Sequence, residues 1–126
     1  MKKKILVVDD EPDFVDLLGV RLQDSGYEVI SASDGASGLK KAQEEKPSLI
    51  ILDILMPKIN GFELCKRLKE NKLTKDIPVI MLTALAQEQD LTKGVKEGED
   101  CFITKPFNST DLIYEIEKAF TKKGER

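Results

Sequence analysis

The residue in this 126-residue chain best suited to chemistry is Asp53. It follows the apolar run Leu49 to Leu52, and a Met-Pro turn at Met56 and Pro57 comes soon after it. A continuous run of large apolar residues predicts a strand buried on both faces, and a charged group at the end of such a strand needs a partner. The stretch LIILDILMPKIN therefore predicts a buried strand that delivers one carboxylate to the end of a sheet.

The types of residue that are present limit the chemistry further. The chain has no histidine, which excludes Ser-His-Asp and Cys-His catalysis and histidine-rich zinc sites. Its two cysteines, Cys65 and Cys101, are far apart in the sequence and are interpreted as buried, reduced thiols. The chemistry that remains uses carboxylates, hydroxyls, lysines and a hard metal ion.

Length and composition indicate one ordinary domain over residues 1–126, with a polar tail at 121–126 that we expect to fray. The hydrophobic share is 40% and the charged share 34%, and no apolar run approaches the roughly 18 residues of a membrane-spanning helix. The apolar run near the N-terminus is too short for a signal peptide, so we expect a cytoplasmic protein without a membrane partner. A net charge of −3 predicts no direct contact of this domain with nucleic acid.

Short apolar runs alternate with longer amphipathic segments along the chain. The predicted strands are Ile5–Val8, Glu28–Ala32, Leu49–Leu52, Val79–Leu82 and Cys101–Ile103. Helical spacing of apolar residues lies between them, and it is weakest near Glu88–Glu97, which has Gly94 inside it. Predicted helix starts are Asp34 or Gly35, Asn60 or Gly61, and Asn108 or Ser109. Continuous apolar strands joined by helices predict an α/β fold, a doubly wound parallel five-stranded sheet of the (βα)5 type.

In such a sheet, ligands bind beyond the carboxyl ends of the strands. The residues that follow four of the predicted strands bear acidic, hydroxyl or basic groups: Asp9, Asp10 and Glu11 after the first, Asp53 after the third, Thr83 after the fourth, and Thr104, Lys105 and Pro106 after the fifth. If the first and third strands are neighbours, three carboxylates lie within a few ångström of one another.

Three crowded carboxylates repel one another unless cations join them. Lys105 is one such cation, and a small hard ion such as Mg²⁺, with oxygen ligands and bound waters, is another. Together with the Thr83 hydroxyl they would receive a phosphoryl group, whose oxygens gain charge in the transition state. Asp53 would then be the nucleophile that forms an acyl phosphate.

Each of these residues also has a purely structural interpretation. Asp9 and Asp10 could cap a helix that begins near Pro12, and Thr83 could cap the segment after its strand. Thr104 could simply end a strand, and Lys105 with Pro106 could form a surface turn. Asp53 is the hardest to explain in this way, because it ends a buried strand.

The motifs D-D-E-P, I-L-D-I-L-M-P-K-I-N-G, P-V-I-M-L-T-A and T-K-P-F resemble the receiver domain of two-component response regulators, over essentially the whole chain. The resemblance implies the flavodoxin-like strand order 2-1-3-4-5, which the chemotaxis member of the family has. It also implies that a histidine kinase, a phosphotransfer protein or a small phosphodonor phosphorylates Asp53.

The resemblance further assigns roles to the surrounding residues. Asp10, Asp53 and the backbone carbonyl of Leu55 would bind Mg²⁺, with Mn²⁺ as a substitute, and Asp9 would help through a water molecule. Lys105 would pair with the carboxylate and then with the phosphate. A cis peptide bond between Lys105 and Pro106, usual at this position in the family, would aim the lysine amine inward. Thr83 would bind the new phosphate, and Phe102 would turn inward with it.

The family usually presents its fourth helix, fifth strand and fifth helix to a downstream effector or a second copy. In this chain, Gly98-Glu99 replaces the family's usual Gly-Ala, which could alter that face. Phe102 has no hydroxyl, so a switch there would work by burial. Leu55 and Leu85 are apolar and cannot orient an attacking water, so we expect slow self-dephosphorylation and no enzymatic turnover.

Three other functions remain as alternatives. An aspartate-nucleophile phosphatase would have a D-x-D sequence after its first strand, whereas Asp53 ends the third strand and precedes Ile54 and Leu55. A nucleotide-binding fold lacks support because there is no Walker sequence. A phosphorylation-independent scaffold would not need the full set of Asp10, Asp53, Thr83 and Lys105.

Overall fold

The computed structural model describes residues 2–54, 59–83, 101–104 and 108–122 as an alternation of strands and helices. In chain order the elements are β1 (Lys4–Val8), α1 (Pro12–Asp24), β2 (Glu28–Ala32), α2 (Gly35–Glu45), β3 (Leu49–Asp53), α3 (Gly61–Glu70), β4 (Val79–Thr83), β5 (Cys101–Thr104) and α5 (Ser109–Lys122). The helix predicted near Glu88–Glu97 lies outside the described residues.

The five strands form one parallel sheet in the order β2-β1-β3-β4-β5. This confirms the predicted fold class and strand order. The register pairs Val8 of β1 with Leu52 of β3, and Asp53 of β3 with Leu82 of β4. As a result, β1 and β3 lie side by side in the middle of the sheet and end at nearly the same level.

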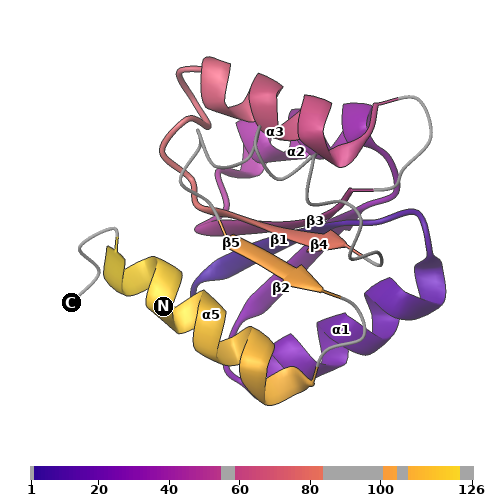
Figure 1. Ribbon diagram of the computed structural model, residues 1–126, viewed down its shortest axis with the longest axis vertical. Helices are drawn as coiled ribbons and strands as arrows, with labels where there is room; N and C mark the ends of the chain where they lie inside the picture. The colour runs from indigo at the N-terminus through magenta and orange to yellow at the C-terminus, as the bar shows by residue number, and fades with distance from the viewer. Residues whose placement is uncertain (1, 55–58, 84–100, 105–107, 123–126) are drawn as a thin grey trace.

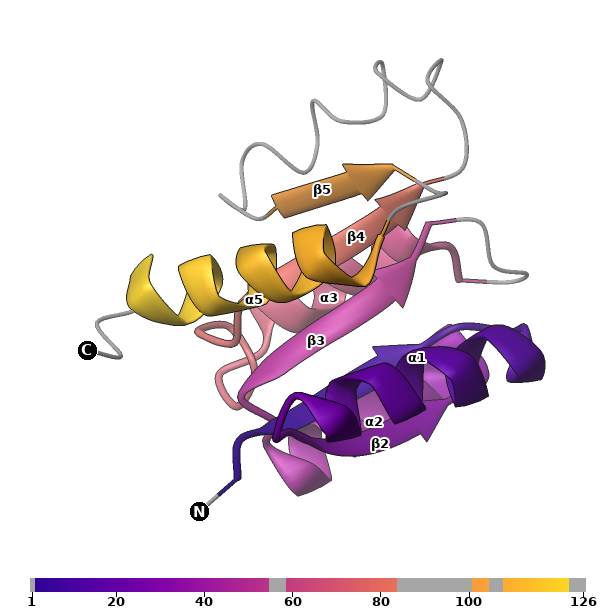
Figure 2. The ribbon, with the colours of Figure 1, turned by 90° about the horizontal axis from the view of Figure 1, so that it is seen from below.

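Helices cover both faces of the sheet, with α2 and α3 on one face and α1 and α5 on the other (Figure 1 and Figure 2). Alternate strand residues supply the two cores, as the two-residue period of a strand requires. In β1, Leu6 and Val8 pack in the core with α2 and α3, whereas Ile5 and Val7 pack in the core with α1 and α5. All four side chains have no exposed surface, which explains why the strand reads as a continuous apolar run.

Three helix starts are fixed by side-chain caps. Asp34, Asn60 and Asn108 each accept a hydrogen bond from the backbone N–H three residues later, at 2.8, 2.9 and 2.8 Å. Such caps satisfy N–H groups that have no partner within the helix, and each stabilises a helix by about 1 kcal/mol. The helix starts predicted from the sequence are therefore confirmed.

Three strands continue one residue beyond their predicted apolar runs, so that Asp53, Thr83 and Thr104 belong to β3, β4 and β5. Backbone pairing causes the extension, because Asp53 pairs with Leu82 and Thr83 pairs with Thr104. The polar residue at each strand end is therefore fixed by the sheet itself.

The connection from α3 to β4 is held by side chains that bond to its backbone. Lys69 Nζ donates to the carbonyl of Ile77 at 2.9 Å, and Thr74 Oγ1 donates to the carbonyl of Leu68 at 2.6 Å. Thr74 is buried, so this bond satisfies a polar group that would otherwise destabilise the fold. These contacts fix the place at which β4 enters the sheet.

Two further observations concern expectations from composition. Within the described part of the chain, none of the helices is both long and apolar enough to cross a membrane. Cys65 is a buried thiol in the core beneath α3, as predicted, and the side chain of Cys101 lies outside the description. Thr121 and Lys122 of the expected polar tail belong to α5, and residues 123–126 lie outside the described residues.

The N-terminus of α3 packs directly against the end of β3 through Gly61. A Cβ atom at this position would lie 2.6 Å from the carbonyl oxygen of Asp53 and 2.7 Å from Cα of Ile54, and both are backbone atoms. The backbone N–H of Gly61 also donates to the carbonyl of Ile54 at 2.9 Å. Glycine therefore allows the close approach that holds the strand end bearing Asp53.

We predict that Gly61→Ala lowers the free energy of unfolding by about 2 kcal/mol, because the added methyl group forces helix and strand apart. Urea unfolding followed by circular dichroism would measure the change. Gly19→Ala is the matched control, since a Cβ there meets only Val29 Cγ1 at an ordinary 3.8 Å. The control should stay within about 1 kcal/mol of the wild type. Equal stability of the two variants would contradict the close contact.

Candidate functional site

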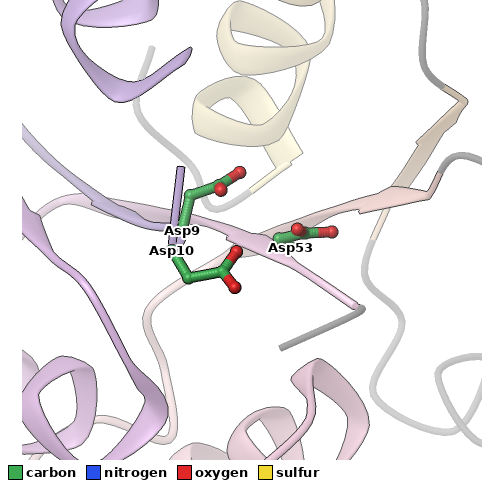
Figure 3. A group of neighbouring side chains, drawn as sticks. All are labelled: Asp9, Asp10 and Asp53. Carbon is green, nitrogen blue, oxygen red and sulfur yellow. The ribbon is translucent and has the colours of Figure 1, made fainter. Parts of the chain in front are cut away.

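Three carboxylates meet at the carboxyl ends of β1 and β3. Asp9 and Asp10 directly follow β1, and Asp53 is the last residue of β3. One carboxylate oxygen from each residue lies within 4.8 Å of the others (Figure 3). The convergence predicted from the strand ends is thus confirmed for the acidic residues, and it follows from the pairing of β1 with β3.

The three acids differ in their exposure to solvent. Asp9 is 2% exposed and Asp53 is 7% exposed, whereas Asp10 is exposed. A buried carboxylate loses hydration and requires compensation from hydrogen bonds or cations. The cluster therefore combines two sheltered carboxylates with one that faces water.

Backbone hydrogen bonds set the position of the acidic residues. The N–H of Asp9 donates to the carbonyl of Ala32 in β2 at 3.1 Å, and the N–H of Ile54 donates to the carbonyl of Leu82 in β4 at 3.1 Å. Each bond continues the sheet pairing one residue past the end of a strand. The acids consequently lie on, or directly after, hydrogen-bonded strands rather than on a long loop.

The structure also tests the interpretation of Asp9 and Asp10 as helix caps. The N-cap of α1 is Glu11, whose side chain makes no capping hydrogen bond, and Pro12 opens the helix. Asp9 Oδ1 accepts a hydrogen bond from the N–H of Glu11 at 2.9 Å. Asp9 therefore shapes the turn into α1, and neither Asp9 nor Asp10 is the N-cap residue.

Three carboxylates in this arrangement provide the ligands that a small hard cation prefers. Mg²⁺ binds oxygen atoms, is usually held by one or two carboxylates, and keeps several waters. The exposed Asp10 beside the sheltered Asp9 and Asp53 leaves one side of the cluster open to solvent. The donor set therefore fits such an ion.

The other predicted site residues are placed only in part. Thr83 ends β4, next to the strand that bears Asp53, and Phe102 lies in β5; only their backbones are described. Leu55, Lys105 and Pro106 lie outside the described residues, as does Leu85.

One residue that positions the site was not predicted from the sequence. Gly61 was expected only as a helix start, yet it contacts the backbone of Asp53 and Ile54. The available signal was the pair Asn60-Gly61 a few residues after the buried strand. Such a pair indicates a turn or a cap, but it does not reveal which backbone the glycine approaches.

Comparison with known proteins identifies the family. Residues 5–117 match the family model described as "Response regulator receiver domain". The chain is 48% identical over 125 residues to the alkaline phosphatase synthesis transcriptional regulatory protein PhoP of Bacillus subtilis, covering 99% of this chain and 51% of that protein. It is 41% identical over 123 residues to the DNA-binding dual master transcriptional regulator RpaA of Synechocystis, covering 98% of this chain and 51% of that protein.

The chain thus spans about half the length of these curated relatives. The name of the Synechocystis protein includes DNA binding, so the predicted absence of a nucleic-acid contact does not extend to that relative as a whole. For this chain it stays a prediction.

Solved structures agree with the family model. A response regulator receiver domain protein from Clostridium thermocellum superimposes with a TM-score of 0.89 at 31% identity, covering 97% of each chain. Chemotaxis protein CheY4 of Vibrio cholerae gives a TM-score of 0.87 at 32% identity, covering 94% of this chain and 99% of that one. The chain therefore belongs to the response regulator receiver domain family, the phosphoacceptor signalling domains of two-component systems.

Proposed function

We propose that Asp53 is the phosphoacceptor of this domain and that a histidine kinase or a phosphotransfer protein is the donor. The observation that carries the proposal is the cluster of Asp9, Asp10 and Asp53, with carboxylate oxygens within 4.8 Å of one another. In the step proposed, an oxygen of Asp53 attacks the phosphorus, the bond to the donor breaks, and an acyl phosphate forms.

We propose that Asp10, Asp53 and the backbone carbonyl of Leu55 hold Mg²⁺, and that Asp9 contributes through a water molecule. Mn²⁺ would bind the same oxygen donors. When bound, the ion supplies positive charge to phosphoryl oxygens that gain charge in the transition state. Support comes from the donor set, because two carboxylates are sheltered from water and the third faces it.

Thr83 and Lys105 are proposed to bind the phosphoryl oxygens, by a hydroxyl hydrogen bond and by charge respectively. The pairing of Asp53 with Leu82 supports the role of Thr83, because it brings the end of β4 beside Asp53. Lys105 follows Thr104, the last residue of β5, which pairs with Thr83. Both groups would then act at the same end of the sheet.

The output surface is proposed to comprise the segment 88–97, β5 and α5, with Phe102 turning inward on phosphorylation. Tyr114 of α5 is 62% exposed. Tyrosine is enriched at protein interfaces, so its place on α5 supports a contact with an effector or with a second copy. Residues 1–126 are proposed to act as one receiver domain that accepts a phosphoryl group without turning over a substrate and does not itself contact nucleic acid.

We predict that Asp53→Asn abolishes labelling by acetyl phosphate in Mg²⁺, because an amide cannot form the acyl phosphate. Intact-mass spectrometry would show the added phosphoryl group in the wild type alone. Asp16→Asn is the control, since Asp16 is an exposed acid on α1 outside the cluster, and it should be labelled normally. Labelling of Asp53→Asn at the wild-type level would refute the assignment, because the phosphoryl group would then be on another residue. A phosphorylation-independent scaffold would be favoured only if Asp53→Asn also left all partner binding unchanged.

We predict that Asp10→Asn weakens Mg²⁺ binding by on the order of tenfold or more, because it removes a charged ligand from a small donor set. Titration with Mg²⁺ by NMR, following the amides at the ends of β1 and β3, would measure the dissociation constant. Mn²⁺ should broaden the same amide signals. Unchanged affinity in Asp10→Asn, or the same loss in Asp16→Asn, would place the ion elsewhere.

We predict slow self-dephosphorylation, because Leu55 and Leu85 offer no polar group to orient an attacking water. After removal of the phosphodonor, the phosphorylated fraction can be followed by mass spectrometry in Mg²⁺. Leu55→Asn should shorten the lifetime by supplying an amide to the water, and Leu55→Met should not. A wild-type half-life of only seconds would show that these positions do not limit hydrolysis.

A further inference from the structure

One edge of the sheet is formed by β2, which pairs with β1 alone among the described strands. Figure 2 shows this strand at the edge of the sheet, between α1 and α2. An edge strand presents N–H and C=O groups to which another strand can pair, and proteins commonly block such edges with charged side chains, especially lysine. We therefore ask which groups bond to the outward N–H and C=O groups of β2.

The register shows which residues of β2 face outward. The N–H of Glu28 donates to the chain just before β1 at 2.9 Å, and the carbonyl of Ala32 accepts from the chain just after β1 at 3.1 Å. In a parallel pair, alternate residues of a strand bond to the same neighbour. Val29 and Ser31 consequently direct their backbone groups away from β1.

The outward carbonyl of Ser31 already has a partner. Lys41, an exposed residue of α2, donates a hydrogen bond from Nζ to this oxygen. The ammonium group therefore occupies the position that the N–H of a neighbouring strand would take. It also puts a positive charge where pairing would have to remove water.

We propose that Lys41 prevents the edge strand β2 from pairing with a strand of a second copy of this chain. Val29 and Ile30 are only partly buried, so a second strand would cover apolar surface there. The β2 edges of two copies can pair with one another, because antiparallel pairing about a two-fold axis is self-complementary. Such pairing would require each Lys41 to release Ser31 and would bring two ammonium groups close together.

This inference does not depend on the proposed phosphorylation of Asp53. It concerns the outer edge of β2, whereas Asp53 belongs to β3, two strands away in the sheet, and it applies to the unphosphorylated protein. A failure of either proposal leaves the other testable.

The test uses Lys41→Met, which keeps an unbranched side chain of nearly the same length and removes the charge and the donor. Lys40→Met is the matched control, because Lys40 is the adjacent exposed lysine of the same helix and loses the same charge. Sedimentation velocity over a range of concentrations gives the dissociation constant for self-association. Hydrogen exchange measured by NMR reports the amides of Val29 and Ser31.

Lys41→Met should associate at least about tenfold more tightly than the wild type, because a hydrogen bond from a charged group no longer has to be broken. The amides of Val29 and Ser31 should then exchange more slowly as concentration rises. Adding Ser31→Pro to Lys41→Met should reverse the association, since proline removes an outward N–H and is tolerated on an edge strand.

Three outcomes would overturn the proposal. Lys41→Met could associate no more tightly than the wild type, Lys40→Met could associate as tightly as Lys41→Met, or the double variant with Ser31→Pro could still associate while circular dichroism shows that it is folded. If Lys41→Met does not fold, Lys41→Leu, which also removes the charge and the donor, is judged by the same criteria.

Discussion

Repulsion among Asp9, Asp10 and Asp53 is the constraint on which the rest of this structure depends. Two of these carboxylates are almost fully buried, which is unfavourable for charged groups, and one oxygen of each lies within 4.8 Å of an oxygen of Asp10. The fold keeps them together because β1 and β3 are fixed by their apolar residues, which have no exposed surface. Each fully buried aliphatic side chain contributes about 1.5–3 kcal/mol, so the core holds the acids where their own charges would separate them. A site built in this way favours anything that brings positive charge.

The start of α3 also helps to hold Asp53 in position. Asn60 caps the helix, and Gly61 lets its first turn approach the backbone of Asp53 and Ile54. The helix thus packs against the end of β3 on one face of the sheet, while β1 and β4 pair with β3 on its two edges. Because backbone rather than side chains makes this contact, the position of Asp53 does not depend on the conformation of a flexible residue.

The sequence predicted much of this arrangement because its local patterns agree with its tertiary structure. Apolar runs located the strands, and Asp34, Asn60 and Asn108 located helix starts, since both signals act over a few residues. Asp53 was expected at the end of its strand, whereas Thr83 and Thr104 were placed after theirs, because pairing with a neighbouring strand, not apolar character, extends β4 and β5. The contact of Gly61 was missed because a local sequence pattern does not distinguish a glycine that only starts a helix from one that also packs against the backbone of another element. Lys105 and Leu55 rest on the sequence motifs and on the family.

The connection from α3 to β4 has a consequence for how the chain tolerates changes in length. Its bonds from Lys69 and Thr74 fix where β4 begins, and the strand sends Val79 and Met81 to one core and Ile80 and Leu82 to the other. A slip of one residue would exchange these two sets. Because such a slip would rearrange both cores, the apolar pattern of β4 holds its register and keeps Thr83 as the last residue of the strand. A change of length in the connection is therefore absorbed before Val79, at the expense of the bonds from Lys69 and Thr74, and Thr83 stays beside the strand that bears Asp53.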